Sequence, residues 1–226
     1  RGAVNVDTLV YSLWMAFLCT ALCLLIGYPV SYVMSREGKR FQKIAMVLIM
    51  LPMWMNFLLR TYAWLNLLDD GGLVLNFMRS IGYKGNIVGT YGAILLGMVY
   101  NYLPFMILPL YNAISKIDDN ILNAARDLGA NELQVTTKVV FPLSFPGVIS
   151  GITMVFVPSV STFAISQMLG GGTELLLGDL IERQFLGGAY NPHLGAAISM
   201  VMMVIVVVCM VVMNHFGEGE EQAVML

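Results

Sequence analysis

The stretch LGAAISMVMMVIVVVCMVVMN, Leu194 to Asn214, contains no Asp, Glu, Lys or Arg. A helix needs about 20 consecutive apolar residues to cross about 30 Å of hydrocarbon. This stretch is long enough and apolar enough to do so. It therefore predicts a membrane-spanning helix.

The composition of the whole chain agrees with a membrane protein. Of 226 residues, 58% are hydrophobic and 12% charged, with a mean hydropathy of +0.77. A soluble domain usually carries about 25% charged residues, so lipid must cover part of this surface. The net charge of −2, with no basic run, gives no sign of a nucleic-acid partner. Cys19, Cys23 and Cys209 lack the spacing of a metal site or disulfide framework.

Five apolar runs are long enough to span a membrane, which predicts an all-α integral membrane protein: a polytopic helix bundle forming a single domain over residues 1–226. Four runs contain a proline inside or near one end, and proline removes a helical hydrogen bond and tends to kink the helix. These prolines indicate either ordinary membrane-helix composition or bent helices around a pathway. The runs are Leu9–Met34, Ile44–Leu68, Tyr91–Ile114, Gly147–Leu169 and Leu194–Asn214.

Lys and Arg in short loops indicate orientation, because they gather on the cytoplasmic side. The first connection holds Arg36, Lys39, Arg40 and Lys43, and the third holds Lys116, Arg126 and Lys138. Both are expected to be cytoplasmic, as is the C-terminal end. The start of the chain is then outside, which predicts a further helix upstream of Arg1.

The connections on the outer side are not simple turns. Gly71 and Gly72 lead into a short apolar segment, Leu73–Ile81. Three further glycines precede Glu174–Leu186, where apolar residues follow helical spacing opposite Asp179, Glu182 and Arg183. This pattern predicts an amphipathic helix at the outer interface. The glycines lack a following Lys-Ser/Thr, so they do not form a phosphate-binding loop.

The connection from 116 to 146, KIDDNILNAARDLGANELQVTTKVVFPLSFP from Lys116, is polar but patterned as two short helices. Asp118, Asp119 and Asn120 are candidate N-caps, and Ile121, Leu122, Ala125 and Leu128 are expected to share an apolar face. Gly129 is a natural helix stop. Asn131 with Gln134 resembles a capping box, and Pro142 with Pro146 is expected to end the second helix. A loop with its own helices and an exposed apolar face is expected to dock on another protein; the alternative is a re-entrant loop packed on its own spans.

These residues resemble the cytoplasmic motif of ABC importer permeases: Glu-Ala-Ala, three residues, Gly, nine residues, then Ile-x-Leu-Pro. Here Asn123-Ala124-Ala125 precedes Gly129 at the correct spacing, and Val139-Val140-Phe141-Pro142 follows. The departure is Asn123, where the family usually has Glu. From about Leu13 to Met213 the chain is also similar to permeases of spermidine/putrescine importers, nearest to their B-type permease. Family members have six helices, so the resemblance implies the type I importer permease fold with the first helix missing here.

The resemblance implies a permease subunit of the bacterial inner membrane, paired with a second permease, ABC ATPase subunits that bind ATP and Mg²⁺, and an extracytoplasmic substrate-binding protein. This chain has no Walker motif and no cofactor of its own, so it is not expected to be an enzyme. The residues implied to couple to the ATPase are Asn123, Ala124, Ala125, Arg126, Asp127, Gly129 and Pro142. The alternatives are a permease for thiamine, ferric ion, sulfate or a phosphonate, or a secondary transporter. Secondary transporters usually show intramembrane ionisable residues or inverted repeats, and neither is found.

Polar and aromatic residues within spans are the default candidates for substrate contact, and aromatic faces attract ammonium groups. Arg60 is interpreted as structural, either snorkelling to the interface or pairing with Asp69 or Asp70. No Asp or Glu lies deep in an expected span. The candidate substrate-pathway residues are Asn56, Tyr62, Tyr100, Tyr102, Ser159, Thr162 and Gln167.

Overall fold

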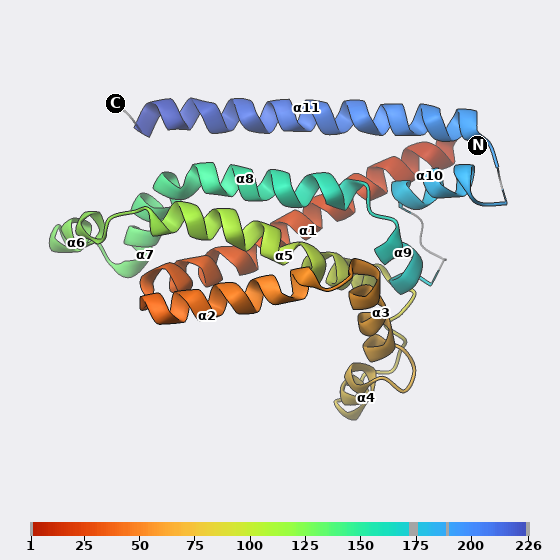
Figure 1. Ribbon diagram of the computed structural model, residues 1–226, viewed down its shortest axis with the longest axis horizontal. Helices are drawn as coiled ribbons and strands as arrows, with labels where there is room; N and C mark the ends of the chain where they lie inside the picture. The colour runs from red at the N-terminus through yellow and green to blue at the C-terminus, as the bar shows by residue number, and fades with distance from the viewer. Residues whose placement is uncertain (1, 172–175, 189, 225–226) are drawn as a thin grey trace.

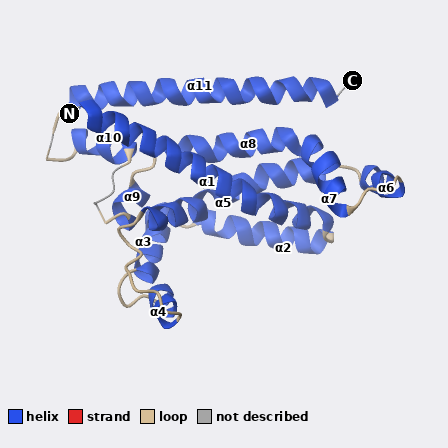
Figure 2. Ribbon diagram, turned by 180° about the vertical axis from the view of Figure 1, so that it is seen from behind, coloured by secondary structure: helices blue, strands red, loops and turns tan. Residues whose placement is uncertain are grey.

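The computed structural model describes residues 2–171, 176–188 and 190–224, and all regular structure in these ranges is helical. Three long helices form the centre of a bundle: α1 (Gly2–Arg36), α5 (Tyr91–Ser115) and α8 (Phe141–Val160). A fourth, α11 (Pro192–Val224), runs alongside α8 at the edge of the bundle (Figure 1). Figure 2 shows the same arrangement from behind, with the connections gathered at the two ends.

Among the described residues, four helices are long and apolar enough to cross a membrane. A fifth crossing is counted only if two helices joined at a sharp bend are taken as one span. The expected continuous span Ile44–Leu68 is therefore wrong as a single helix. It consists of α2 (Lys39–Met50), the 3-10 helix η1 (Leu51–Trp54) and α3 (Phe57–Leu68).

The break in this span has a local cause. Pro52 is the second residue of η1, and Met55 is extended, with φ −76° and ψ 150°. Asn56 then caps a new helix, because its Oδ1 accepts from the amides of Leu58 and Leu59 at 2.9 and 3.2 Å. The chain turns by 94° here. As a result α3 and the short α4 (Leu73–Ser80) project from the side of the bundle (Figure 1).

The expected span Gly147–Leu169 also differs from the structure. Its helix begins earlier, at Phe141, and ends at Val160, two residues after Pro158. A separate short helix, α9 (Ala164–Leu169), follows. In contrast, α1 passes Pro29, and α5 passes Pro104 and Pro109, each as one helix.

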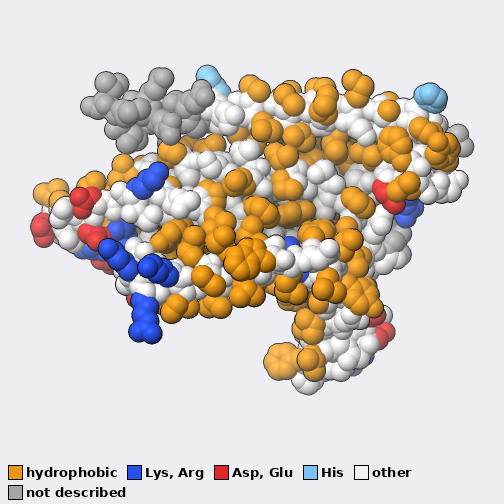
Figure 3. Space-filling model, in the orientation of Figure 1, with side chains coloured by type: hydrophobic (Ala, Val, Ile, Leu, Met, Phe, Trp, Pro, Cys, Tyr) orange, Lys and Arg blue, Asp and Glu red, His pale blue; other side chains and the backbone are white. Residues whose placement is uncertain are grey.

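The core lies along α5, whose buried side chains include Ile94, Met98, Met106 and Leu110. Close approach of α8 depends on glycine: a Cβ on Gly147 would lie 2.8 Å from the carbonyl oxygen of Pro109. By contrast α11 buries no residue of its most apolar stretch. Its outward face is a surface for lipid, in agreement with the apolar side chains that cover it in Figure 3.

The predicted outer amphipathic helix is confirmed as α10 (Leu177–Phe185), although Glu174 lies outside the described residues. One part of that prediction is wrong: Asp179, placed on the polar face, is fully buried. The neighbouring Gly178 has no Cβ and lets α10 approach the carbonyls of Ser161 and Thr162 closely, and the buried carboxylate accepts hydrogen bonds from Ser166 and the Leu176 amide.

Candidate functional site

The connection from 116 to 146 contains the two predicted helices, α6 (Asp119–Asp127) and α7 (Glu132–Val135). Asp118 caps α6, accepting from the Asn120 amide at 2.9 Å. Asn131 and Gln134 form the predicted capping box, with bonds of 2.8 and 3.0 Å. Gly129 has φ +88°, a conformation that glycine adopts without strain. These capping and turn predictions are confirmed, and α6 and α7 form a hairpin, hereafter the 119–135 hairpin.

The expected stop at Pro142 is wrong. The chain passes from α7 through a π-helical turn, Thr136–Val140, directly into α8, where Pro142 occupies the first turn. Pro142 has no amide to donate, and the π-helical turn directly before it is where the regular bonding of this continuous helix changes. The hairpin is therefore continuous with a membrane-spanning helix through α7.

The apolar residues of α6 do not share one face as expected. Leu122 is buried and Ala125 packs beneath the loop, whereas Ile121 and Leu128 point outward, with 46% and 90% of their surface exposed. Leu133 of α7 is 72% exposed. The exposed apolar surface of the hairpin, defined here by Ile121, Leu128 and Leu133, is therefore available to a partner.

The other residues assigned to coupling lie mostly at the surface. Asn123, Ala124, Arg126, Asp127 and Gly129 are exposed. Arg126 forms a two-bond ion pair with Glu132, at 2.7 and 3.1 Å, and also donates to Asn123 Oδ1 at 3.1 Å. Glu132 accordingly raises the pKa of the Arg126 guanidinium. Asn123, the residue that departs from the family motif, is thus engaged by its own chain.

The hairpin stands on a small apolar core of its own. Buried Ile114, Ile117, Leu122, Val135 and Val140 form it, and Tyr28 and Tyr32 of α1 pack against it. Tyr28 also shares a hydrogen bond of 2.9 Å with Ser144 of α8. The base of the hairpin is therefore packed against three of the long helices, while its tip projects beyond the bundle (Figure 1).

The seven candidate pathway residues do not gather around one cavity. Asn56 caps α3, and Gln167 donates to Glu182 at 2.9 Å. Tyr102 and Ser159 are buried and bond to backbone carbonyls. Thr162 is buried, Tyr62 is exposed, and Tyr100 packs edge-on against Trp64 at 5.0 Å between ring centroids. Their role in substrate contact stays a prediction.

A cleft of about 540 Å³ lies between η1, α5 and α8, and sequence reasoning missed it. On α5 and its C-cap residue Lys116 the lining residues recur at helical spacing, as in Phe105, Leu108 and Asn112. This periodicity on one face is the signal that the sequence offers. Ser150 adds a hydroxyl from α8. The complete lining is Met53, Phe105, Leu108, Pro109, Asn112, Ala113, Lys116, Pro146, Gly147, Ser150 and Met154.

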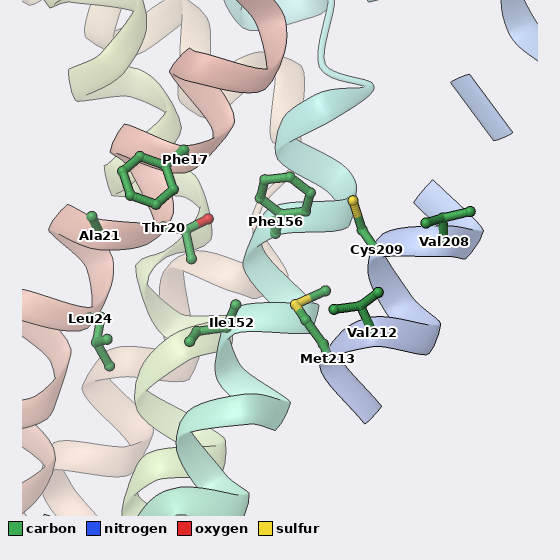
Figure 4. Close-up of a pocket in the computed structure, with 10 residues that line it drawn as sticks. All are labelled: Phe17, Thr20, Ala21, Leu24, Ile152, Phe156, Val208, Cys209, Val212 and Met213. Atoms are coloured by element: carbon green, nitrogen blue, oxygen red, sulfur yellow. The ribbon is translucent and has the colours of Figure 1, made fainter. Parts of the chain in front are cut away.

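A second cavity, of about 510 Å³, separates α11 from α1 and α8 (Figure 4). No charged side chain lines it, and its one hydroxyl, on Thr20, donates to the carbonyl of Ala16 at 2.8 Å. It lacks the acceptors that a cationic solute would require. Its lining is Phe17, Thr20, Ala21, Leu24, Ile152, Phe156, Val208, Cys209, Val212 and Met213.

Two buried polar residues lie near the end opposite the hairpin. Arg60 is 8% exposed and donates to the carbonyl of Pro52 at 2.6 Å, which supports its structural interpretation. It does not pair with Asp70, which binds Arg79 instead. Asp179 accepts from Ser166 and from the Leu176 amide. Burial raises the pKa of Asp179, against the opposing effect of these two bonds.

Comparison with known proteins agrees with this architecture. Residues 11–218 match the family model described as binding-protein-dependent transport system inner membrane component. The chain is 39% identical over 197 residues, 86% of its length and 68% of the relative, to the spermidine/putrescine transport system permease protein PotB of Haemophilus influenzae. It is 36% identical to PotB of Escherichia coli over 202 residues, 88% of this chain and 73% of that one.

The fold is shared with a solved transporter of low sequence identity. A chain of the bacterial alginate ABC transporter, solved with an alginate pentasaccharide-bound periplasmic protein, superposes with a TM-score of 0.72. The match is 17% identical and covers 92% of this chain and 78% of the other. The helix bundle is thus that of type I ABC importer permeases. The chain belongs to the family of inner-membrane components of binding-protein-dependent transport systems, multi-pass proteins of the bacterial inner membrane.

Proposed function

We propose that this chain is a permease subunit of an ATP-driven importer for polyamines, spermidine or putrescine. The observation that carries the proposal is the similarity to permeases named for these substrates, which extends over 86% of this chain at 39% identity. The geometry of the hairpin concerns the contact with the ATPase and is independent of the solute that is carried. Permeases for other small solutes are therefore the alternative, and the experiment below separates them.

The partners follow from the family and from the exposed hairpin. The 119–135 hairpin offers Ile121, Leu128 and Leu133 to a cytoplasmic ATPase subunit, within the coupling set Asn123 to Asp127, Gly129 and Pro142. ATP and Mg²⁺ belong to that subunit, and this chain itself is no enzyme. A second, different permease completes the pathway, and an extracytoplasmic binding protein delivers the solute.

The orientation proposed for the chain places the hairpin in the cytoplasm. The C-terminal end of α11 lies at the same end of the bundle (Figure 1), so it is cytoplasmic too. The distribution of charge supports this, because Lys and Arg gather at the hairpin end in Figure 3, as the positive-inside rule requires. Carboxylates share this end, and they have little influence on topology.

Movement of a polyamine would use neutral acceptors rather than paired carboxylates in this subunit. Lys116 is the one charged residue of the cleft between η1, α5 and α8, and it repels ammonium groups at the cytoplasmic mouth. Asn112 and Ser150 offer oxygen atoms in this cleft, and outside it the candidates Tyr62 and Tyr100 offer aromatic ring faces. Weak binding near the mouth favours release into the cytoplasm.

The test is transport by the reconstituted complex. The chain is co-expressed with the ATPase, second permease and binding protein of its transport system, and placed in proteoliposomes containing ATP. We expect uptake of labelled putrescine or spermidine and ATP hydrolysis that rises with the loaded binding protein. Thiamine, ferric ion, sulfate and a phosphonate form parallel arms. Uptake of one of these, with no uptake of either polyamine, would overturn the substrate assignment.

A further inference from the structure

A single guanidinium joins three elements at the base of the hairpin. Arg36 is the last residue of α1. Its Nη1 donates to Asp119 Oδ1 of α6 at 2.5 Å and to the carbonyl of Ile117 at 3.4 Å. Its Nη2 donates to the carbonyl of Ile114, in the last turn of α5, at 3.2 Å. Arg36 therefore links the ends of α1 and α5 to the start of the hairpin.

These bonds differ in strength. Asp119 is 76% exposed, and ion pairs open to water contribute little to stability. The carbonyls of Ile114 and Ile117 belong to residues that are 0% and 8% exposed. Loss of a charged donor from such acceptors costs more, because they cannot be fully rehydrated. The two backbone bonds thus tie α1 firmly to the end of α5 and to Ile117, two residues before the hairpin, and the bond to Asp119 extends this link to the hairpin itself.

Arg36 also adds polar bonds to the apolar contact between α1 and the core beneath the hairpin. Tyr28 and Tyr32 of α1 pack on the core beneath the hairpin, and the guanidinium lies 5.9 Å from the centre of the Tyr32 ring. Apolar packing holds α1 near the loop but is non-directional. A planar guanidinium with several donors sets direction as well as distance. The side chain is 20% exposed, so it is held in place by its surroundings.

The hairpin has little internal freedom between its tip and Arg36. Arg126 and Glu132 tie α6 to α7 by two bonds, and both helices have side-chain caps at their first turns. These bonds favour movement of the hairpin as one unit when it is displaced at Leu128.

The helix that Arg36 ends extends to the opposite side of the bundle. Ser12 of α1 accepts a hydrogen bond of 2.6 Å from the Leu177 amide of α10. Residues 12 and 36 are 24 positions apart in one helix, which is about 36 Å. A displacement of the inner end of α1 is therefore delivered near the outer connection between α8 and α11.

We propose that Arg36 is the positioning residue that passes movement of the 119–135 hairpin to α1 and α5. This inference rests on the proposed function, in which an ATPase moves the hairpin. Closure of the ATPase pair displaces α6, and the three bonds of Arg36 require α1 and α5 to follow. Without them, the hairpin moves while the ends of these two helices lag behind, and ATP hydrolysis no longer drives transport efficiently.

The test compares ATP hydrolysis with uptake in the complete reconstituted importer. For Arg36→Gln we expect the complex to assemble and hydrolyse ATP, while the number of ATP molecules consumed per solute imported rises about tenfold, within the usual range of coupling effects. The matched control is Arg79→Gln. Arg79 forms a similar exposed ion pair with Asp70 at 2.6 Å, far from the hairpin, and its loss should leave the ratio unchanged.

Two further variants keep the test decisive if Arg36→Gln fails to assemble. Asp119→Asn removes the exposed charge but leaves both backbone bonds, so the ratio should rise less than in Arg36→Gln. Arg36→Lys keeps the charge but has no planar fork, so it should fall between the wild type and Arg36→Gln. A wild-type ratio in both Arg36 variants, or in Arg36→Lys and Asp119→Asn together, would overturn the inference. Absence of polyamine uptake by the wild type would instead refute the proposed function.

Discussion

Arg126 and Glu132 form an ion pair that closes the 119–135 hairpin, with Nε 2.7 Å from Oε1 and Nη2 3.1 Å from Oε2. The pair spans the turn at Gly129 and fixes the angle between α6 and α7. Because both side chains are largely exposed, 39% and 71%, the pair contributes little to global stability. Its effect is to hold the exposed apolar surface of the hairpin in one arrangement.

We therefore expect Glu132→Gln to weaken docking without unfolding the chain. The thermal midpoint of the purified complex should change little, since ion pairs open to water contribute little to stability. Affinity for the isolated ATPase subunit should fall several-fold, because a looser hairpin must be ordered on binding. Titration of the ATPase against the permease pair in detergent measures this. Glu37→Gln, an exposed acid outside the hairpin, is the control; equal affinities of the Glu132 variant and this control would contradict the prediction.

Substitutions of Gly129 should act through the conformation of the backbone rather than through a clash of the new side chain. Gly129 has φ +88°, and a Cβ added there would meet no atom within 4 Å. The penalty for another residue is therefore conformational, about 1–2 kcal/mol for most L-residues and less for Asn, which tolerates this region. We expect Gly129→Val to abolish most uptake and Gly129→Asn to retain most of it.

Uptake by both variants, at equal amounts of assembled complex, checks this expectation. Equal loss in Asn and Val would indicate that the open space around Gly129 is filled by the ATPase in the complex. In that case the backbone argument would be wrong, although docking at this turn would still be supported.

Because Asp179 is buried, we expect the folding stability of the protein to depend on pH. Burial raises the pKa of Asp179 above the ordinary value of 3.8, so the folded protein favours the protonated acid more than the unfolded chain does. Its contribution to stability is then fully present below the unfolded pKa and is lost as pH rises through the folded pKa. Asp179→Asn cannot ionise, so its stability relative to the wild type should increase as pH rises from about 4.

Thermal unfolding in detergent at a series of pH values measures this difference. Asp179→Ala is the informative control, because it also loses the acceptor for Ser166 and the Leu176 amide. It should be less stable than the Asn variant throughout, by about 1–3 kcal/mol for the unsatisfied buried donors. A difference between wild type and Asn that stays constant with pH would show that Asp179 does not titrate in this range.

Gly147 tests the close contact between α5 and α8. A Cβ at this position would overlap Ala113 and lie 2.8 Å from the carbonyl oxygen of Pro109. We expect Gly147→Val to push the two helices apart at a cost of about 1–3 kcal/mol or more, and to reshape the cleft that Gly147 lines. Lower thermal stability and reduced uptake should appear together. Gly188→Val is the control, since a Cβ there meets nothing within 4 Å.

Local features of the sequence determined much of this structure. The capping residues Asp118 and Asn131, the stop at Gly129 and the helical spacing of α10 were all predicted, because each depends on residues within one or two turns. Apolar runs likewise predicted where the long helices lie. The spacing from Ala124 and Ala125 to Gly129 and Pro142 was sufficient to indicate the family.

Only the tertiary structure decided which face of each helix is buried and which is exposed. Hydropathy could not show that Leu122 points inward and Leu128 outward, because the choice depends on Tyr28 and Tyr32, some 90 residues earlier in the chain. Nor could it show that Asp179 is buried and bonded to Ser166 of α9, or that Arg36 reaches Asp119, 83 residues away. The spacing of apolar residues every three or four positions predicts that a segment is helical. Which of its side chains are buried or hydrogen-bonded depends on the other helices that pack against it.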